Sequence, residues 1–114
     1  MPIEKAIELL KELCPRVYQQ GSMAPNEPYP ARFFTFWNPE TSDAIHFDNA
    51  ASGCVWVLDV NFYSMDPLDI YSTIAAAMDT MQAAGWIIGG KGHAVASDYH
   101  THTGRGFTAA YLEI

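Results

Sequence analysis

One segment, residues 54–85, constrains the fold of this chain more than any other. Its first part, residues 54–63, alternates between two faces with the period of two that a β-strand requires. We expect one face to point into the core and the other, which carries Asp59 and Asn61, to be partly solvated. The predicted core face consists of Trp56, Leu58, Val60 and Phe62.

The second part of this segment predicts an amphipathic helix. Asp66 is a suitable N-cap, Pro67 suits the first helical position, and Asp69 would interact favourably with the positive end of the helix dipole. Gly85 is expected to end the helix in a left-handed conformation. Apolar side chains follow at helical spacing on one face, at Ile70, Ile74, Met78 and Met81.

Weaker signals flank this segment on both sides. Apolar residues at helical spacing predict a helix over residues 3–13, with Pro15 just beyond its end. β-branched and aromatic residues predict further strands, and stretches rich in turn-forming residues predict loops. The strands are expected at 17–20, 32–38, 45–48, 86–88 and 107–114, and the loops at 21–30, 38–43, 49–53, 89–92 and 93–106. Residues 38–53 are also a candidate for a long hairpin arm.

The order of these elements predicts the fold class. The connections between neighbouring strands are too short for crossover helices, so most strands should pair antiparallel. The chain is therefore expected to be α+β, with a mostly antiparallel β-sheet and two helices packed on one face. Its length of 114 residues agrees with a single domain over residues 1–114.

The composition limits the possible partners. A formal net charge of -7, with six Lys and Arg residues, argues against general binding to nucleic-acid phosphates. No stretch approaches the ~20 apolar residues of a membrane span, and the first residues lack the apolar run of a signal peptide. Cys14 and Cys54 match neither a disulfide framework nor a zinc motif, so we expect free thiols and folding in the cytoplasm.

The histidines are the candidates for a metal site. His100 and His102 are two residues apart and would project from the same side of an extended segment. With His93, or with His46 and Asp48, they could bind a metal ion. However, no third ligand stands at a fixed spacing. The alternative is a polar loop whose histidines form hydrogen bonds or face a partner.

No other motif indicates catalysis. Residues 89–92, Gly-Gly-Lys-Gly, lack the spacing of a phosphate-binding loop. Helix capping explains Asp66 and Asp69 without acid–base chemistry, and no serine lies in a Gly-x-Ser-x-Gly motif. Five large side chains could line a ligand cavity but have the spacing of core residues: Trp56, Met65, Met78, Met81 and Trp86. We therefore predict no enzyme, no catalytic residue and no cofactor.

Arg105 stands between two glycines in Thr-Gly-Arg-Gly, residues 103–106. An arginine in this setting could reach a carboxylate on a neighbouring subunit, because its guanidinium forms bidentate contacts. The alternative is a solvated turn before the last strand.

Three stretches together resemble small proteins from the tail modules of long-tailed bacteriophages and prophages. They read Pro-Tyr-Pro-Ala-Arg-Phe-Phe-Thr-Phe-Trp-Asn at 28–38, Val-Asn-Phe-Tyr-Ser-Met-Asp-Pro-Leu-Asp-Ile-Tyr at 60–71, and Ser-Asp-Tyr-His-Thr-His-Thr-Gly-Arg-Gly at 97–106. In its expected layout of N-terminal helix, antiparallel sheet and second helix, the chain is similar to the tail terminator (tail-completion) family.

This resemblance implies a structural protein of the virion, located in the tail at the head–tail interface after assembly in the host cytoplasm. Members of the family form hexameric rings that cap the tail tube, stop its polymerisation and present a surface to the head. The implied partners are other copies of the chain, the major tail tube protein and a head-completion or connector protein. DNA would pass through the ring without specific binding. We expect the loops at 21–31, 38–53 and 91–106 to contact partners.

Two other functions stay open on the sequence alone. A head–tail connector or neck adaptor protein would have the same fold and similar partners. A small metal-binding domain would instead depend on His93, His100 and His102.

Overall fold

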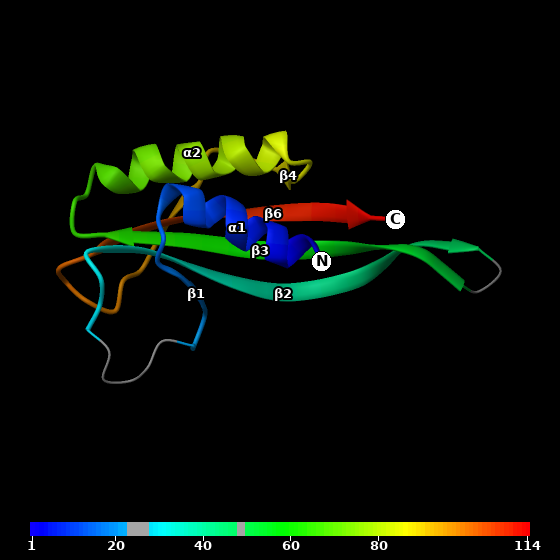
Figure 1. The fold of residues 1–114 in the computed structure, drawn as a ribbon, viewed down its shortest axis with the longest axis horizontal. Helices are drawn as coiled ribbons and strands as arrows, with labels where there is room; N and C mark the ends of the chain where they lie inside the picture. The colour runs from blue at the N-terminus through cyan, green and yellow to red at the C-terminus, as the bar shows by residue number, and fades with distance from the viewer. Residues whose placement is uncertain (23–27, 48–49) are drawn as a thin grey trace.

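The computed structural model describes residues 1–22, 28–47 and 50–114, while the side chains of residues 43–52 lie outside the description. The helices are α1 (Pro2–Leu13) and α2 (Asp69–Ala83). The strands are β1 (Val17–Gln19), β2 (Arg32–Phe47), β3 (Ala50–Ser64), β4 (Ile87–Ile88), β5 (His93–Val95) and β6 (Thr103–Glu113). Figure 1 shows the fold with the long axis of the molecule horizontal. The predicted α+β fold is confirmed, as a six-stranded, mostly antiparallel sheet that two helices contact.

The strands form one sheet in the order β1-β2-β3-β6-β4, and β5 pairs with another part of β6. The three long strands pair antiparallel with one another, β2 with β3 and β3 with β6. The short edge strand β1 runs parallel to β2, with Val17 opposite Phe34. This is the exception in an otherwise antiparallel sheet.

The core lies between the helices and one face of the sheet. The predicted inward face of β3 is confirmed, because Leu58, Val60 and Phe62 are buried and Trp56 packs against the core from its edge. Across this face, Phe34 contacts Phe62, with ring centroids 4.7 Å apart. The helices cover these rings with Ala6 and Leu10 from α1 and Ile70, Ile74, Ala77, Met78 and Met81 from α2. Met78 and Met81 are therefore core residues, whereas Met65 is exposed.

The helix α2 begins later than the sequence predicts. Asp66 and Pro67 lie in a turn, where the backbone N–H of Leu68 donates to the Asp66 carboxylate at 3.0 Å, and the helix starts at Asp69. The predicted C-terminus is confirmed. Gly85 has φ 101°, and the N–H of Trp86 donates to the carbonyl of Met81 at 3.0 Å. This pattern is a Schellman motif.

Asp69 does more than complement the helix dipole. Arg32 Nε donates to Asp69 Oδ2 at 2.9 Å, and Nη2 donates to Oδ1 at 3.1 Å. The Thr73 hydroxyl donates to the same carboxylate at 2.8 Å. Hydrogen bonding to Arg32 lowers the pKa of Asp69 below its ordinary value, and the bond from Thr73 contributes in the same direction. The first residue of β2 is thus tied to the first turn of α2.

The predicted hairpin arm is confirmed, but the loops expected at 38–43 and 49–53 are wrong. β2 continues through Asn38 and Pro39, where a bulge separates the Trp37–Asp59 pair from the Glu40–Val57 pair. The Asn38 amide donates to the carbonyls of Glu40 and Val57, so the bulge is held by the side chain that predicted a turn. Residues 50–53 of the second expected loop belong to β3.

The C-terminal strand is also longer than predicted. The loop expected at 93–106 contains β5 and the start of β6, which pairs with β3 from Thr103 onward. Gly104 and Gly106 are strand residues that pair with β3. Glycine is required at both positions, because a Cβ would lie 2.8 Å from the Tyr63 ring at the first and 2.8 Å from the Val60 carbonyl oxygen at the second. Glycines that predict a turn therefore permit close packing across the sheet.

Candidate functional site

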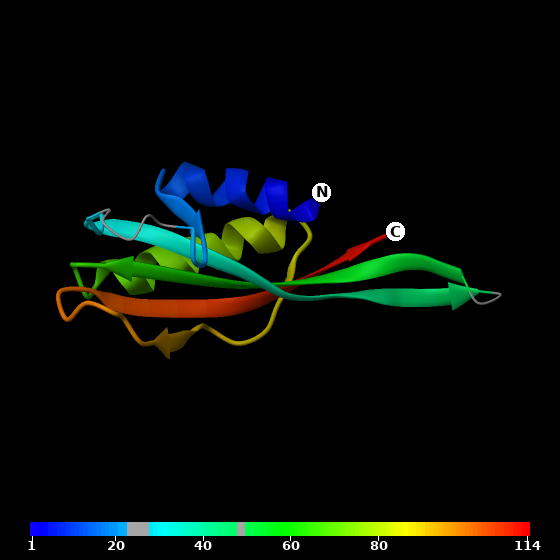
Figure 2. The same cartoon turned by 90° about the horizontal axis from the view of Figure 1, so that it is seen from below.

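The sheet has one face free of helices, and Figure 2 looks onto it. Residues on this face are the ones that alternate with the core residues of β2, β3 and β6. They include Phe33, Thr35 and Trp37 of β2, opposite Tyr63, Asn61 and Asp59 of β3. Two features of this face suggest function: a pocket near one end and a long two-stranded arm at the other.

The pocket, which we call the open-face pocket, has a volume of about 460 Å³. Its floor is the helix-free face of β2 and β3, and its walls come from the segments after β1, before β2 and after β5. Two of the three segments predicted to contact partners, 21–31 and 91–106, therefore meet here. The lining residues are Tyr18, Gln19, Gln20, Gly21, Tyr29, Phe33, Thr35, Asn61, Tyr63, Ala96, Ser97 and Asp98.

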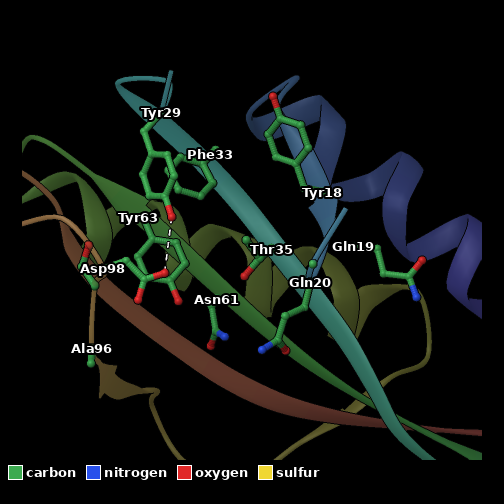
Figure 3. A pocket seen from close by; sticks show the side chains of 12 residues that line it. Tyr18, Gln19, Gln20, Tyr29, Phe33, Thr35, Asn61, Tyr63, Ala96 and Asp98 are labelled. Atoms are coloured by element: carbon green, nitrogen blue, oxygen red, sulfur yellow. Dashed lines mark hydrogen bonds between the residues drawn. The ribbon is translucent and has the colours of Figure 1, made fainter. Parts of the chain in front are cut away.

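Aromatic rings are concentrated at one end of the pocket, as Figure 3 shows. Phe33 and Tyr63 are stacked across the β2–β3 pair, with centroids 5.2 Å apart and planes at 26°. Tyr29 meets Phe33 edge to face at 5.3 Å. Outside the pocket lining, Tyr99 packs on Tyr29 at 4.3 Å. Edge-to-face and offset pairs of this kind each contribute about 0.5–1.5 kcal/mol beyond burial, so the aromatic wall is preorganised.

The polar groups of the pocket centre on Asp98. The Tyr29 hydroxyl donates to Asp98 Oδ2 at 3.3 Å (Figure 3). Burial raises the pKa of Tyr29, and the charge of Asp98 raises it further. Burial also raises the pKa of Tyr63, against a smaller opposite effect of its hydrogen bond with Thr35. Both phenols, neutral at pH 7 in any case, therefore ionise only above the ordinary value of about 10.

His102 holds the pocket wall in place. Its ring is buried, with Nε2 2.8 Å from the carbonyl oxygen of Pro30 and Nδ1 2.9 Å from the hydroxyl of Thr101. The ring also lies 5.9 Å from the Phe33 ring, measured between centroids. His102 thus joins the segment before β2 to the segment before β6. This agrees with the alternative in which the histidines form hydrogen bonds.

The structure does not bring His93, His100 and His102 together as a metal site. His93, in β5, pairs through its backbone with Gly106 of β6. His100 is exposed in the turn between β5 and β6. Among the described residues, no group of three or more His, Cys, Asp or Glu side chains is arranged to hold a metal ion. The His46 side chain and Asp48 lie outside the described residues.

Arg105 is engaged within its own chain rather than in a solvated turn. Its guanidinium lies 4.9 Å from the centre of the Tyr71 ring and donates to the carbonyls of Lys91 and Gly92 at 3.1 and 3.3 Å. It thus fastens the glycine turn at 89–92 to β6 and α2.

Neither Cys14 nor Cys54 is in a disulfide, as the sequence predicts. Cys14 is buried beside the carbonyl oxygen of Arg32, at 3.6 Å, whereas Cys54 is partly buried beside Glu113.

The arm lies at the end of the molecule away from the pocket. Pairing between β3 and β6 begins at Cys54, so the described residues beyond it, 45–47 and 50–53, pair with each other as a two-stranded ribbon. In Figures 1 and 2 the ribbon extends beyond both helices and the end of β6. The molecule is accordingly 53 Å long and only 29 and 22 Å across.

The sequence did not predict the pocket residues as a site. The signal was present in the aromatic residues of the non-core face, Phe33 and Tyr63, because a solvated sheet face rarely needs stacked rings. Tyr29 and Asp98 come from loops, and their positions depend on tertiary packing.

Comparisons with known proteins leave the family of this chain open. No protein-family model matches it, and a search of the curated proteins finds no match. Within the described residues, neither helix combines the length and the apolar character needed to cross a lipid bilayer.

Proposed function

We propose that this protein is a phage tail terminator: a subunit of a ring, expected to be hexameric, that caps the tail tube and joins it to the head. In this proposal it acts by assembly and carries no catalytic residue. The resemblance of three sequence stretches to tail-module proteins supports the family. The observation that carries the assembly role is the projecting β2–β3 arm.

The arm supports assembly because a two-stranded hairpin on its own is only marginally stable in water. Residues 45–47 and 50–53 pair with each other, and Figure 1 shows no helix against them. Packing against a neighbouring copy would stabilise these strands. A contact between different surfaces of successive subunits also generates a closed ring when the rotation between them is suitable.

Exposed apolar side chains on the sheet and at the end of β6 provide surface for such a contact. Trp37 and Leu112 lie on the helix-free face with exposed fractions of 51% and 44%. Ile87 and Ile114, close to the same end of β6, are exposed by 69% and 85%. Burial between copies would remove this apolar area from water, which is favourable by about 25 cal/mol per Å².

The acidic balance of the chain fits a ring through which DNA passes. A net charge of -7 would repel the phosphate backbone and prevent DNA from adhering to the lumen. The partners proposed are further copies of the chain, the major tail tube protein and a head-completion protein. The proposed location is the virion, at the head–tail interface.

A shortened arm tests the assembly role directly. Asp43 and Cys54 are paired across the hairpin, so a two-residue Asn-Gly turn can replace residues 44–53 without removing any β3–β6 pair. We expect this variant to keep its urea midpoint but to lose ring formation, measured by native mass spectrometry and by co-sedimentation with purified tail tubes. Rings formed by the variant as readily as by the complete protein would contradict the proposal.

Particles that lack the protein test the terminator role. Electron microscopy should show overlong tails without heads, because nothing would stop tube polymerisation. Tails of normal length beside filled, unattached heads would instead identify a connector or neck adaptor.

A metal-binding domain is tested separately by elemental analysis of the purified protein. Stoichiometric metal bound through His93, His100 and His102 would contradict a purely structural role.

A further inference from the structure

Among the described residues that line the open-face pocket, there are one formal charge and four aromatic rings. The charge is the carboxylate of Asp98, and the rings belong to Tyr18, Tyr29, Phe33 and Tyr63. None of the lysines or arginines of the chain is among the residues that line it. We propose that this pocket binds a guanidinium group.

Electrostatics favour a cation in this pocket. The faces of aromatic rings carry partial negative charge and attract cations within about 6 Å of the ring centre. Asp98 adds a full negative charge at the same wall, while the phenols of Tyr29 and Tyr63 are neutral at pH 7, as phenols with a pKa of about 10 or above are. An anionic ligand would meet the carboxylate and the ring faces without a compensating basic residue among the lining groups.

The arrangement of acceptors favours guanidinium over ammonium. A guanidinium is planar, stacks on aromatic faces and has five N–H donors, whereas an ammonium is a compact and strongly hydrated charge. The pocket offers the Asp98 carboxylate and the side-chain carbonyl oxygens of Asn61, Gln19 and Gln20. Figure 3 shows Asn61 and Gln20 near the middle of the pocket, with Tyr29, Tyr63 and Asp98 together at one end. A flat group lying on the aromatic wall could donate to both sets of oxygens.

The size of the pocket exceeds that of the guanidinium itself. A volume of about 460 Å³ leaves room for the alkyl stem and adjacent atoms. The guanidinium can therefore come from a free arginine-like compound or from an arginine side chain that a protein presents. Both sources share the same chemistry, and the experiment below separates them. The inference does not depend on ring formation.

The test is a titration followed by ¹H–¹⁵N NMR of the complete protein. The probe is N-acetyl-arginine methylamide, and the matched control is N-acetyl-citrulline methylamide, which has the same shape without the charge. We expect saturable shifts confined to amides of the pocket, such as those of Asn61, Tyr63 and Asp98. The citrulline compound should bind about three- to fivefold more weakly, as expected for loss of one exposed charge contact. Free L-arginine then separates the sources: tighter binding than the blocked probe indicates a free compound, and weaker binding indicates a chain-embedded arginine.

Two matched variants localise the site. Asp98→Asn should weaken binding about three- to fivefold, because the amide still accepts from Tyr29 but carries no charge. Asp59→Asn is the control, since Asp59 lies on the same sheet face, accepts from Thr108 at 2.8 Å and does not line the pocket. The proposal is overturned if the arginine probe produces no saturable shifts, if citrulline binds equally well, or if the two variants behave alike.

Discussion

The ion pair between Arg32 and Asp69 connects the start of β2 to the start of α2. Two guanidinium donors meet the two carboxylate oxygens at 2.9 and 3.1 Å, and the Thr73 hydroxyl lies 3.0 Å from Arg32 Nη2. The guanidinium also lies over the Phe62 ring, 5.2 Å from its centre. We predict that Asp69→Asn destabilises the protein, because Arg32 then keeps its position in the fold without an opposite charge.

The structure sets the expected size of this effect. The side chains of Arg32 and Asp69 are exposed by 41% and 20%, so the pair lies between the surface and buried cases. Exposed pairs contribute about 0.2–1 kcal/mol, and removal of one partner of a buried pair costs about 3–5 kcal/mol. We therefore expect Asp69→Asn to lower the free energy of unfolding by about 2 kcal/mol. For a domain of this length, that corresponds to a Tm lower by about 8 °C.

Urea unfolding of a double-mutant cycle provides the assay. The variants are Asp69→Asn, Arg32→Met and their combination, measured at pH 7 and low salt. We expect a coupling free energy of about 1 kcal/mol. A coupling below about 0.3 kcal/mol would show that the two residues act independently and would refute the reasoning.

The pH dependence of stability gives a second measurement on the same pair. The pKa of Asp69 is lowered in the folded protein, so the contribution of the pair is fully present above the unfolded-state value of about 3.9. It is lost as the pH falls from there through the folded-state pKa. Stability should therefore decrease less steeply with acid in Asp69→Asn than in the unchanged protein.

Two further predictions concern β6 and the pocket. Gly106→Ala should destabilise the protein by about 2–3 kcal/mol in urea unfolding, because the new Cβ would lie 2.8 Å from the Val60 carbonyl oxygen. Gly89→Ala, where a Cβ meets nothing within 4 Å, is its matched control, and equal losses would contradict the packing argument. In absorbance titration, Tyr63→Phe should remove a phenol that ionises above pH 10, the ordinary value. Because that pKa is raised on folding, stability should fall as the pH rises beyond 10, and less so in the variant.

Most of the core could be predicted from local patterns. The alternation of residues 54–63 correctly assigns Leu58, Val60 and Phe62 to the core, because a strand with one buried face permits only one register of its side chains. The helical spacing of residues 70–81 identifies the buried face of α2 for a similar reason. Gly85 marks the end of that helix, since its left-handed backbone is a local requirement.

Prediction failed where turn-forming residues lie inside paired strands. Asn38 and Pro39 form a bulge in β2, and Gly104 and Gly106 pack closely against β3. These residue types indicate a local preference for turns, whereas the observed strands depend on hydrogen bonds to a neighbouring strand. The same limit applies to Asp69, whose partner Arg32 is far away in the sequence.

The candidate site could hardly be predicted, because it depends almost entirely on tertiary structure. The sequence placed Tyr63 on a partly solvated face and marked the segments around Tyr29 and Asp98 for contacts, but it did not bring them together. Local periodicity by itself determined which faces of the main strand and helix are apolar, because each residue's direction follows from its neighbours along the chain. Only the tertiary structure decided which loops meet over the helix-free face, since that depends on contacts between residues such as Tyr29 and Asp98, which lie far apart in the chain.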